Sequence, residues 1–351
     1  MRPVDAGPTA PVDPADRIRP VFDHLEALTD ERGLFEHARL ATPRVEHGYC
    51  VDDVARALVV TSQEPHPGPV VQRLHEGYLA FVLSALSPDG ACHNRMDPQG
   101  RWADDAGLGD WWGRALWSLG VAAASSPTAG RRARALAGFR IAAQRRSPDH
   151  RASAFAALGA AELLRVRPAE PAARALLEHL AHTLGRQPAA PGWVWPEPRL
   201  TYANATLAEA LLVAGATLPD DDVLARGLEL LTFLMRTEVQ DGRLSVTPVA
   251  GRGPGEVGGG FDQQPIEIAA IAQACATAHR VTGDPAWLTG VELAQRWFLG
   301  DNDAATVMYD PATGAGYDGL EPAGRNENQG AESTLALLAT AQLARQAAEL
   351  R

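Results

Sequence analysis

Two kinds of helical segment alternate along the chain from about residue 15 onward. One kind is amphipathic, with charged residues along one side, as in residues 135–146. The other is rich in Ala and Leu on nearly every side, as in residues 336–344. A helix that is apolar nearly all round is normally buried among other helices, whereas an amphipathic helix covers a core with one face. The pattern therefore predicts buried helices that alternate with half-exposed ones.

Counting these segments gives six pairs. The amphipathic helices are predicted at residues 15–28, 69–86, 129–146, 169–186, 219–237 and 285–299. The apolar helices are predicted at residues 51–62, 112–125, 151–165, 203–217, 265–281 and 330–347. Six such hairpins can close into an all-α (α/α)6 toroid with the apolar helices inside. An open helical solenoid also alternates helix pairs, but the units differ in length and show no repeat consensus, so we favour the closed ring.

The segments between the helices add two details. Short β-prone pieces at residues 91–96, 243–248 and 306–310 precede apolar helices, which predicts short β-hairpin loops at one mouth of the ring. No linker divides the chain, so one domain is expected over residues 15–351. Residues 1–14 are predicted to be a disordered tail.

Composition narrows the choice of partner and location. The net charge of -11 argues against nucleic acid or an anionic membrane surface, because both would need a basic face. No apolar run is long enough to span a membrane, and no basic-then-apolar signal segment opens the chain. The three cysteines form neither a disulfide framework nor a metal motif, which favours a reducing, cytoplasmic location.

Polar and aromatic residues gather just before or at the start of the apolar helices. Because all six inner helices of a toroid begin at one mouth, these groups are expected to meet in one cleft. Aromatic rings that stack on a sugar and planar polar groups that pair with its hydroxyls would suit a carbohydrate substrate. The predicted substrate contacts are Tyr49, Asp52, Arg56, His93, Asn94, Trp111, Arg114, Trp195, Tyr202, Asn204, Asp262, Gln263, Gln264, Glu267, Asn326, Glu327, Asn328 and Gln329.

Several of these residues have an ordinary alternative role. Asp, Asn and Ser at helix starts are common N-caps, worth about 1 kcal/mol each. Capping does not require Trp111, Trp195, Tyr202 and the polar run 326–329 together, so we favour a functional cleft. Two carboxylates facing each other across it could act as general acid and base.

The predicted catalytic residues are Asp53 and Glu332, with Asp110 next and Glu267 and Asp262 in reserve. Of the adjacent pair Asp52 and Asp53, one is expected to face the cleft while the other caps the helix or binds Arg56 or Arg114.

Other chemistries have weaker signals. No HxxxH or HExxH spacing indicates a metal site, and neither a GxGxxG after a strand nor a P-loop indicates a nucleotide, so no metal and no cofactor are expected. Cys50 stands where a nucleophile could act, but it has no obvious His partner in the sequence, which favours a small packed residue.

Four blocks carry a resemblance to a known family. Residues 48–58 read GYCVDDVARAL against the family's GYCTDDNARAL, and residues 113–120 read GRALWSLG against GRALWALG. FDQQPIE at residues 261–267 and NENQGAEST at residues 326–334 resemble two later blocks. The chain is thereby similar to bacterial proteins of the six-hairpin glycosidase-like superfamily, often labelled glycosyltransferase. The resemblance implies an (α/α)6 barrel, a carbohydrate substrate and a possible glycosyltransferase as partner.

Three functions follow as hypotheses. The first is a glycoside hydrolase, in which one carboxylic acid protonates the departing oxygen. The second is a sugar epimerase or isomerase with His as acid and base, which inward placement of His47 with His93 or His150 would favour. The third is a non-catalytic carbohydrate-binding domain that works with a glycosyltransferase, which a cleft without a suitably spaced carboxylate pair would favour.

Overall fold

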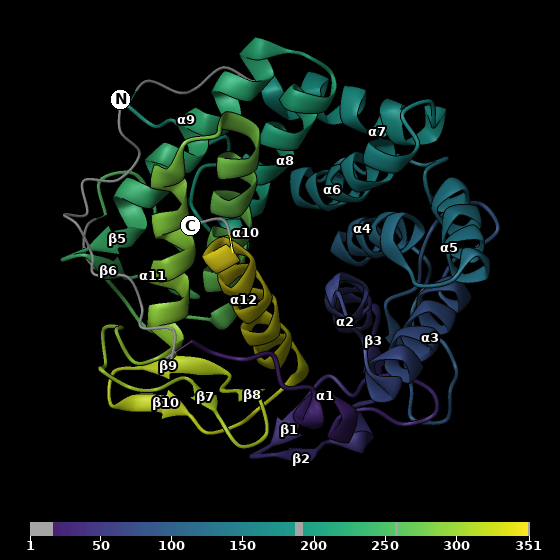
Figure 1. Cartoon of the computed structure of the whole chain (residues 1–351), viewed down its shortest axis with the longest axis horizontal. Helices are drawn as coiled ribbons and strands as arrows, with labels where there is room; N and C mark the ends of the chain where they lie inside the picture. The colour runs from purple at the N-terminus through teal and green to yellow at the C-terminus, as the bar shows by residue number, and fades with distance from the viewer. Residues whose placement is uncertain (1–16, 187–191, 257–258, 350–351) are drawn as a thin grey trace.

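The helices form a ring of two concentric layers in the computed structural model, which describes residues 17–186, 192–256 and 259–349 (Figure 1). Six helices form the inner layer: α2 (Val51–Gln63), α4 (Asp110–Ser125), α6 (His150–Val166), α8 (Asn204–Thr217), α10 (Pro265–Thr282) and α12 (Ala331–Glu349). Each packs against the next, and α12 packs against α2. This closure confirms the (α/α)6 toroid, because an open solenoid would leave its first and last units apart.

The outer layer follows the predicted amphipathic segments. It consists of α1 (Asp23–Ala27), α3 (Pro69–Ser84), α5 (Ala129–Ala142), α7 (Pro171–Leu180), α9 (Asp221–Glu238) and α11 (Leu288–Phe298). A π-helical turn, Ala181–Gly185, extends α7, and short 3-10 turns lie at Val45–His47 and Pro285–Trp287.

The first outer helix is shorter than predicted. Of the predicted segment 15–28, the structure describes residues 17–28, and only Asp23–Ala27 is helical there. Pro20 explains the late start, because a proline inside a helix removes a backbone donor and clashes with the preceding turn. The predicted tail, residues 1–14, lies outside the described residues.

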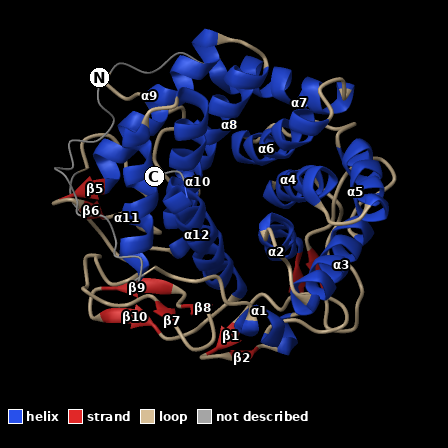
Figure 2. Cartoon of the chain, viewed as in Figure 1, coloured by secondary structure: helices blue, strands red, loops and turns tan. Residues whose placement is uncertain are grey.

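Short antiparallel strand pairs lie in the connections that enter inner helices, and so at the mouth where those helices begin (Figure 2). Strand β3 (Tyr49–Cys50) leads directly into α2 and pairs with β4 (Arg95–Met96), from the connection before α4. The other pairs are β1 (Ala38–Arg39) with β2 (Thr42–Pro43), β5 (Val239–Gln240) with β6 (Arg243–Leu244), β7 (Tyr309–Asp310) with β8 (Ala315–Gly316), and β9 (Gly319–Glu321) with β10 (Gly324–Asn326). The predicted hairpin loops are therefore confirmed.

Glycines let the backbones of α4 and α6 approach closely. A Cβ atom on Gly120 would lie 2.1 Å from the carbonyl oxygen of Gly159, and one on Gly159 would lie 2.3 Å from that of Leu116. Gly113 lies two helical turns before Gly120, and a Cβ atom added to it would lie 2.2 Å from the carbonyl oxygen of Ala152. The GRALWSLG block thus supplies the two small residues that this helix contact needs.

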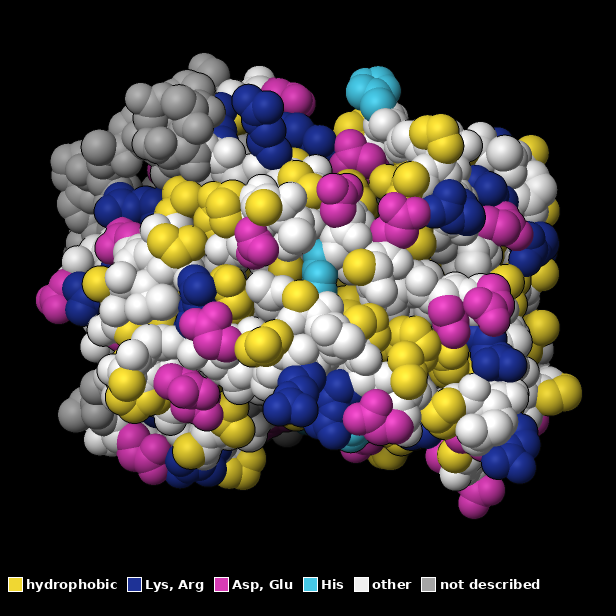
Figure 3. All heavy atoms as spheres, turned by 90° about the horizontal axis from the view of Figure 1, so that it is seen from below, with side chains coloured by type: hydrophobic (Ala, Val, Ile, Leu, Met, Phe, Trp, Pro, Cys, Tyr) yellow, Lys and Arg dark blue, Asp and Glu magenta, His cyan; other side chains and the backbone are white. Residues whose placement is uncertain are grey.

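The outside of the ring is of mixed character. On the face shown in Figure 3, basic and acidic side chains are interspersed with apolar ones, and neither charge dominates. In the described part of the chain, no helix combines the length and the apolar character needed to cross a membrane.

Glu238, at the end of α9, is a buried carboxyl group with no ion pair among the residues that the structure describes. It is 2% exposed and accepts hydrogen bonds from the backbone N–H and the hydroxyl of Thr247, both at 2.5 Å. Burial raises its pKa to about 7 from an ordinary 4.5, although the Thr247 hydroxyl and Arg252 oppose the rise. The folded state therefore binds this proton more tightly than the unfolded chain does.

This contribution to stability is complete below about pH 4.5 and is lost as the pH rises through about 7. Between about pH 5 and about pH 8, we expect the free energy of unfolding of the wild type to fall by about 1–3 kcal/mol more than that of Glu238→Gln. Urea denaturation of both proteins at both pH values measures the difference. Identical falls would contradict the expectation.

Candidate active site

A cavity of about 350 Å³ opens at the mouth where the inner helices begin; we call it the entrance cavity. It is lined by Glu36, His37, Cys50, Asp52, Asp53, Arg56, Arg114, Tyr202, Gln264, Ile266, Asp318, Gly330, Glu332 and Ser333. Five of these side chains are carboxyl groups and two are guanidinium groups. Of the predicted site residues, the fold brings together Asp52, Asp53, Arg56, Arg114, Tyr202, Gln264 and Glu332.

Arg56 joins the two residues predicted first as catalysts. Its Nη1 lies 2.5 Å from Oδ1 of Asp53, three residues earlier on α2, and its Nη2 lies 2.8 Å from Oε2 of Glu332 on α12. One guanidinium group thus holds the carboxylates of Asp53 and Glu332 side by side. Asp53 is 4% exposed at its side chain and Glu332 is 38% exposed, so Glu332 is the more accessible.

Asp52 is held by a different arginine. Nη1 of Arg114, on α4, donates to Oδ1 of Asp52 at 2.5 Å, and the amide of Asn94 donates to Oδ2 at 3.3 Å. Burial alone would raise the pKa of Asp52, but the guanidinium groups of Arg114 and Arg56 outweigh it and hold this pKa below its ordinary value. Asp52 is therefore ionised at neutral pH.

Asp53 has the opposite electrostatics. Burial raises its pKa to about 7 against the opposing charge of Arg56, and the carboxylates of Glu332, Glu36 and Asp52 add to the rise. Two adjacent residues on one helix turn thus differ in protonation near neutral pH. Carboxyl groups whose pKa values are driven apart by their surroundings are the usual basis of acid–base catalysis.

Asp110 reaches the entrance cavity only through its partners. The Tyr202 hydroxyl donates to Oδ2 of Asp110 at 2.7 Å, and Nη2 of Arg114 lies 3.7 Å from the same oxygen. The guanidinium of Arg151 lies over the Tyr202 ring, 4.6 Å from its centroid. Tyr202 therefore presents a partly exposed, firmly held ring at the rim.

Seven lining residues were not among the predicted site residues, and three of them, Glu36, His37 and Asp318, carry ionisable side chains from the connections between elements. Glu36 and His37 come from the connection between α1 and α2, and Asp318 comes from the connection between β8 and β9. Glu36 forms an ion pair with Arg95, and Asp318 accepts from the backbone N–H of Gly330 at 2.7 Å while burial raises its pKa. Their only sequence signal is their place in connections that enter inner helices, since no motif surrounds them.

The remaining predicted residues do not line the entrance cavity. They are Tyr49, His93, Asn94, Asp110, Trp111, Trp195, Asn204, Asp262, Gln263, Glu267, Asn326, Glu327, Asn328 and Gln329. Many hold the mouth together: the Tyr49 hydroxyl donates to Asp30 at 2.7 Å, and the Gln263 amide donates to Asp303 at 2.8 Å. These two hydrogen bonds link connections at the mouth to one another and stabilise the loops there.

Glu267, a reserve catalytic residue, is such a case. It is 6% exposed and accepts from the backbone N–H and the side-chain amide of Asn204, both at 3.3 Å. It also accepts from the N–H of Ala203, which has a left-handed backbone at the start of α8. Glu267 therefore organises the entry to α8.

Comparisons with known proteins support the fold. No family model matches the chain, and no curated protein matches it in sequence. The chain superposes on cellobiose 2-epimerase from Bacillus thermoamylovorans with a TM-score of 0.69, at 11% identity over 94% of this chain and 97% of that one. For D-mannose isomerase the TM-score is 0.66, at 11% identity over 93% of this chain and 95% of that one. For a cellulase of C. cellulolyticum the TM-score is 0.62, at 8% identity over 90% of this chain and 87% of that one. The chain has the six-hairpin glycosidase-like fold.

The three solved structures named here are an epimerase, an isomerase and a cellulase, so one fold is shared by proteins named for different reactions on carbohydrates. At these identities the likeness establishes the fold alone. The reaction has to be inferred from the side chains at the mouth.

None of the three histidines that would favour an epimerase lines the entrance cavity. His47 lies on the exposed rim, where its Nε2 is 3.7 Å from Oε1 of Glu46. His150 is the first residue of α6. The His93 ring stacks on Trp102, with centroids 5.3 Å apart, and its Nδ1 lies 2.8 Å from the carbonyl oxygen of Asp104. The histidine that does line the cavity is His37, whose side chain is 49% exposed.

Glu36, Cys50 and Asp53 form the one group in the described ranges whose ligand atoms approach a metal-binding arrangement, within 4.8 Å of one another. Burial, together with the charges of Asp53 and Asp52, raises the pKa of the Cys50 thiol well above its ordinary value. A protonated thiol is a poor ligand, and both carboxylates already bind arginines. These residues therefore fit a metal ion poorly.

The thiol chemistry of the chain can be checked directly. Cys50, Cys92 and Cys275 are each 2% exposed or less, and burial raises all three pKa values. We expect a thiol-specific reagent such as 5,5′-dithiobis(2-nitrobenzoic acid) to react with none of them in the native protein, and with all three after denaturation. Rapid labelling of Cys50 in the native state would contradict the packed-residue interpretation.

Proposed function

We propose that this protein is a glycoside hydrolase that acts on an oligosaccharide or glycoconjugate through the carboxyl groups of the entrance cavity. The observation that carries the proposal is the Asp53–Arg56–Glu332 arrangement, in which a carboxyl with a pKa of about 7 lies beside a more exposed one. The inward pair of histidines that would favour an epimerase is missing from the lining residues.

In this mechanism Asp53 is the general acid. Its carboxyl proton passes to the glycosidic oxygen as the bond from that oxygen to the anomeric carbon breaks. The Asp53 carboxylate that results stays within 2.5 Å of Nη1 of Arg56, whose positive charge stabilises it. Arg56 therefore stabilises the charge that develops on the acid during proton transfer.

Glu332 is the second catalytic carboxyl. Carboxyl groups about 5–5.5 Å apart suit a retaining mechanism, whereas an inverting one needs about 6.5–9.5 Å to admit water. Because one guanidinium holds both groups, we favour the shorter spacing. Glu332 would then attack the anomeric carbon, and the Asp53 carboxylate would deprotonate the water that releases the sugar.

The first test is a panel of α- and β-linked manno-, gluco- and galacto-oligosaccharides, with the products separated by chromatography. In water enriched in ¹⁸O, hydrolysis with cleavage between the anomeric carbon and the glycosidic oxygen places ¹⁸O on the anomeric carbon of the released sugar, while the leaving group keeps its own oxygen. In D₂O, an epimerase would instead place deuterium on a sugar carbon without breaking a linkage.

Asp53→Asn and Glu332→Gln serve as parallel variants, with circular dichroism to confirm folding. Cleavage that both substitutions abolish supports the hydrolase and its catalytic pair. Deuterium incorporation without cleavage would contradict the hydrolase proposal and favour a sugar epimerase. Binding without turnover, equal in the wild type and both variants, would leave a carbohydrate-binding domain that works with a glycosyltransferase.

A further inference from the structure

A second and larger cavity, of about 950 Å³, opens at the opposite mouth of the ring, where the inner helices end. We call it the far cavity. Its lining comes from the C-terminal halves of inner helices and from the connections that follow them, and it shares no residue with the entrance cavity. Ligand sites in proteins commonly occupy about 300–1,000 Å³, so the far cavity is large enough for a mono- or disaccharide.

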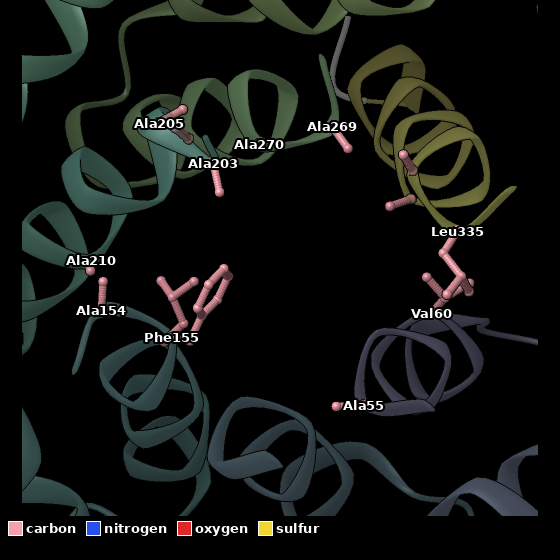
Figure 4. Packing of buried hydrophobic residues seen from close by; sticks show 14 of the residues in the cluster. Ala55, Val60, Ala154, Phe155, Ala203, Ala205, Ala210, Ala269, Ala270 and Leu335 are labelled. Atoms are coloured by element: carbon pink, nitrogen blue, oxygen red, sulfur yellow. The ribbon is translucent and has the colours of Figure 1, made fainter. Parts of the chain in front are cut away.

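A narrow throat of about 40 Å³ lies between the two cavities. It shares Arg56, Ile266 and Glu332 with the entrance cavity, and Trp117 and Gln273 with the far cavity. Figure 4 shows apolar side chains around this central opening, with the Phe155 ring directed into it. A water molecule needs about 10–15 Å³ of such volume, so the throat has room for water but not for a sugar. A sugar in the far cavity therefore lies apart from Asp53, which lines the entrance cavity alone.

Two buried acceptors at the far cavity have no hydrogen-bond partner among the described residues. Glu209 is 8% exposed; its Oε1 accepts from the Thr277 hydroxyl at 2.9 Å, but its Oε2 is unpaired. Gln342 is 1% exposed; its Nε2 donates to the carbonyl oxygen of Val60 at 3.0 Å, but its Oε1 is unpaired. Both residues line the far cavity. Buried polar atoms are rarely left unpaired in native proteins, so these oxygens indicate a missing donor.

The rest of the lining indicates an uncharged ligand. Glu64 is paired with Arg345, and Glu162 with Arg165, so these charges are already compensated. The side-chain amides of Gln273 and Gln346 add donors and acceptors, and the partly buried Trp117 ring, stacked on Phe155, adds an apolar face. Amides and carboxyls that accept from hydroxyls, beside an aromatic ring, match the two kinds of surface of a sugar.

We propose that the far cavity is a second binding site, which takes a neutral mono- or disaccharide whose hydroxyls pair with the polar side chains that line it, among them Glu209 and Gln342. The site is independent of the chemistry proposed at the entrance cavity, since the throat separates them. Its occupant is a second sugar, bound on the same chain but not turned over there.

The test is isothermal titration calorimetry of the whole chain with D-glucose, D-mannose, D-galactose, maltose and cellobiose, and with glucose 6-phosphate as a charged probe. Ala276→Trp fills the far cavity from a partly exposed position, and Glu209→Gln replaces one acceptor oxygen with a donor at constant volume. Ala133→Trp, on the exposed side of α5, is the matched control.

We expect at least one neutral sugar to bind saturably, with an affinity that falls about tenfold or more in both far-cavity variants and is kept in Ala133→Trp. Glu332→Gln, at the other mouth, should leave this binding event in place, which separates it from failure of the hydrolase proposal. No saturable binding, binding unaffected by Ala276→Trp, or tighter binding of glucose 6-phosphate in the same cavity would overturn the proposal.

Discussion

Replacing Asp53 with Asn is expected to lower kcat/KM for a glycoside with a poor leaving group by about 10²–10⁴-fold. Asn keeps the shape of the side chain but has no acidic proton to give to the departing oxygen. The loss should shrink for an aryl glycoside whose leaving group departs without protonation. Comparing the two kinds of substrate therefore separates loss of the acid from general damage to the site.

The pH profile gives an independent reading of the same residue. Burial raises the pKa of Asp53 to about 7, and the protonated form is the active acid. Activity of the wild type should therefore fall as the pH rises through about 7, and Asp53→Asn should lose this alkaline limb. The matched control is Asp318→Asn, because Asp318 is a cavity carboxyl without an arginine partner among the described ion pairs. This variant should keep the alkaline limb of the pH profile. An unchanged alkaline limb in Asp53→Asn would exclude it as the acid.

Replacing Gly120 with Ala is expected to lower the free energy of unfolding by about 3 kcal/mol. The added Cβ would lie 2.1 Å from the carbonyl oxygen of Gly159, and that oxygen belongs to a helix backbone that cannot rotate away as a side chain could. The α4 and α6 helices would have to separate, and with them Arg114 and Arg151 at the mouth. A loss of activity should accompany the loss of stability.

The matched control is the same substitution in an outer helix. Gly77 lies within α3 with nothing near its Cβ position, so Gly77→Ala should raise stability by about 0.5–1 kcal/mol through its helix propensity. Urea denaturation of both variants measures the difference in sign. Similar effects of the two substitutions would show that helix propensity, rather than the close approach of α4 and α6, governs Gly120.

The hydrophobic pattern was sufficient to predict the architecture, because the periodicity of apolar residues in each helix shows whether the helix is buried on all sides or on one side. The predicted apolar segments agree with the inner helices to within two residues at each end. Where the helix prediction failed, at residues 17–22, a proline within the segment outweighed the hydrophobic pattern. Parallel inner helices then required the polar groups at their starts to meet at one mouth.

The sequence by itself therefore determined the ring, its two layers and the mouth at which Asp52, Asp53, Arg56 and Glu332 meet. Only the tertiary structure decided which polar residues face the cavity: Gln263 turns toward the loops, while Glu36 arrives from a connection without a motif. The reason is that a period of 3.6 residues reports burial, but not whether the buried side meets packed loops or an open cavity. The pKa difference between two adjacent aspartates likewise depends on neighbours from other helices, which no local pattern contains.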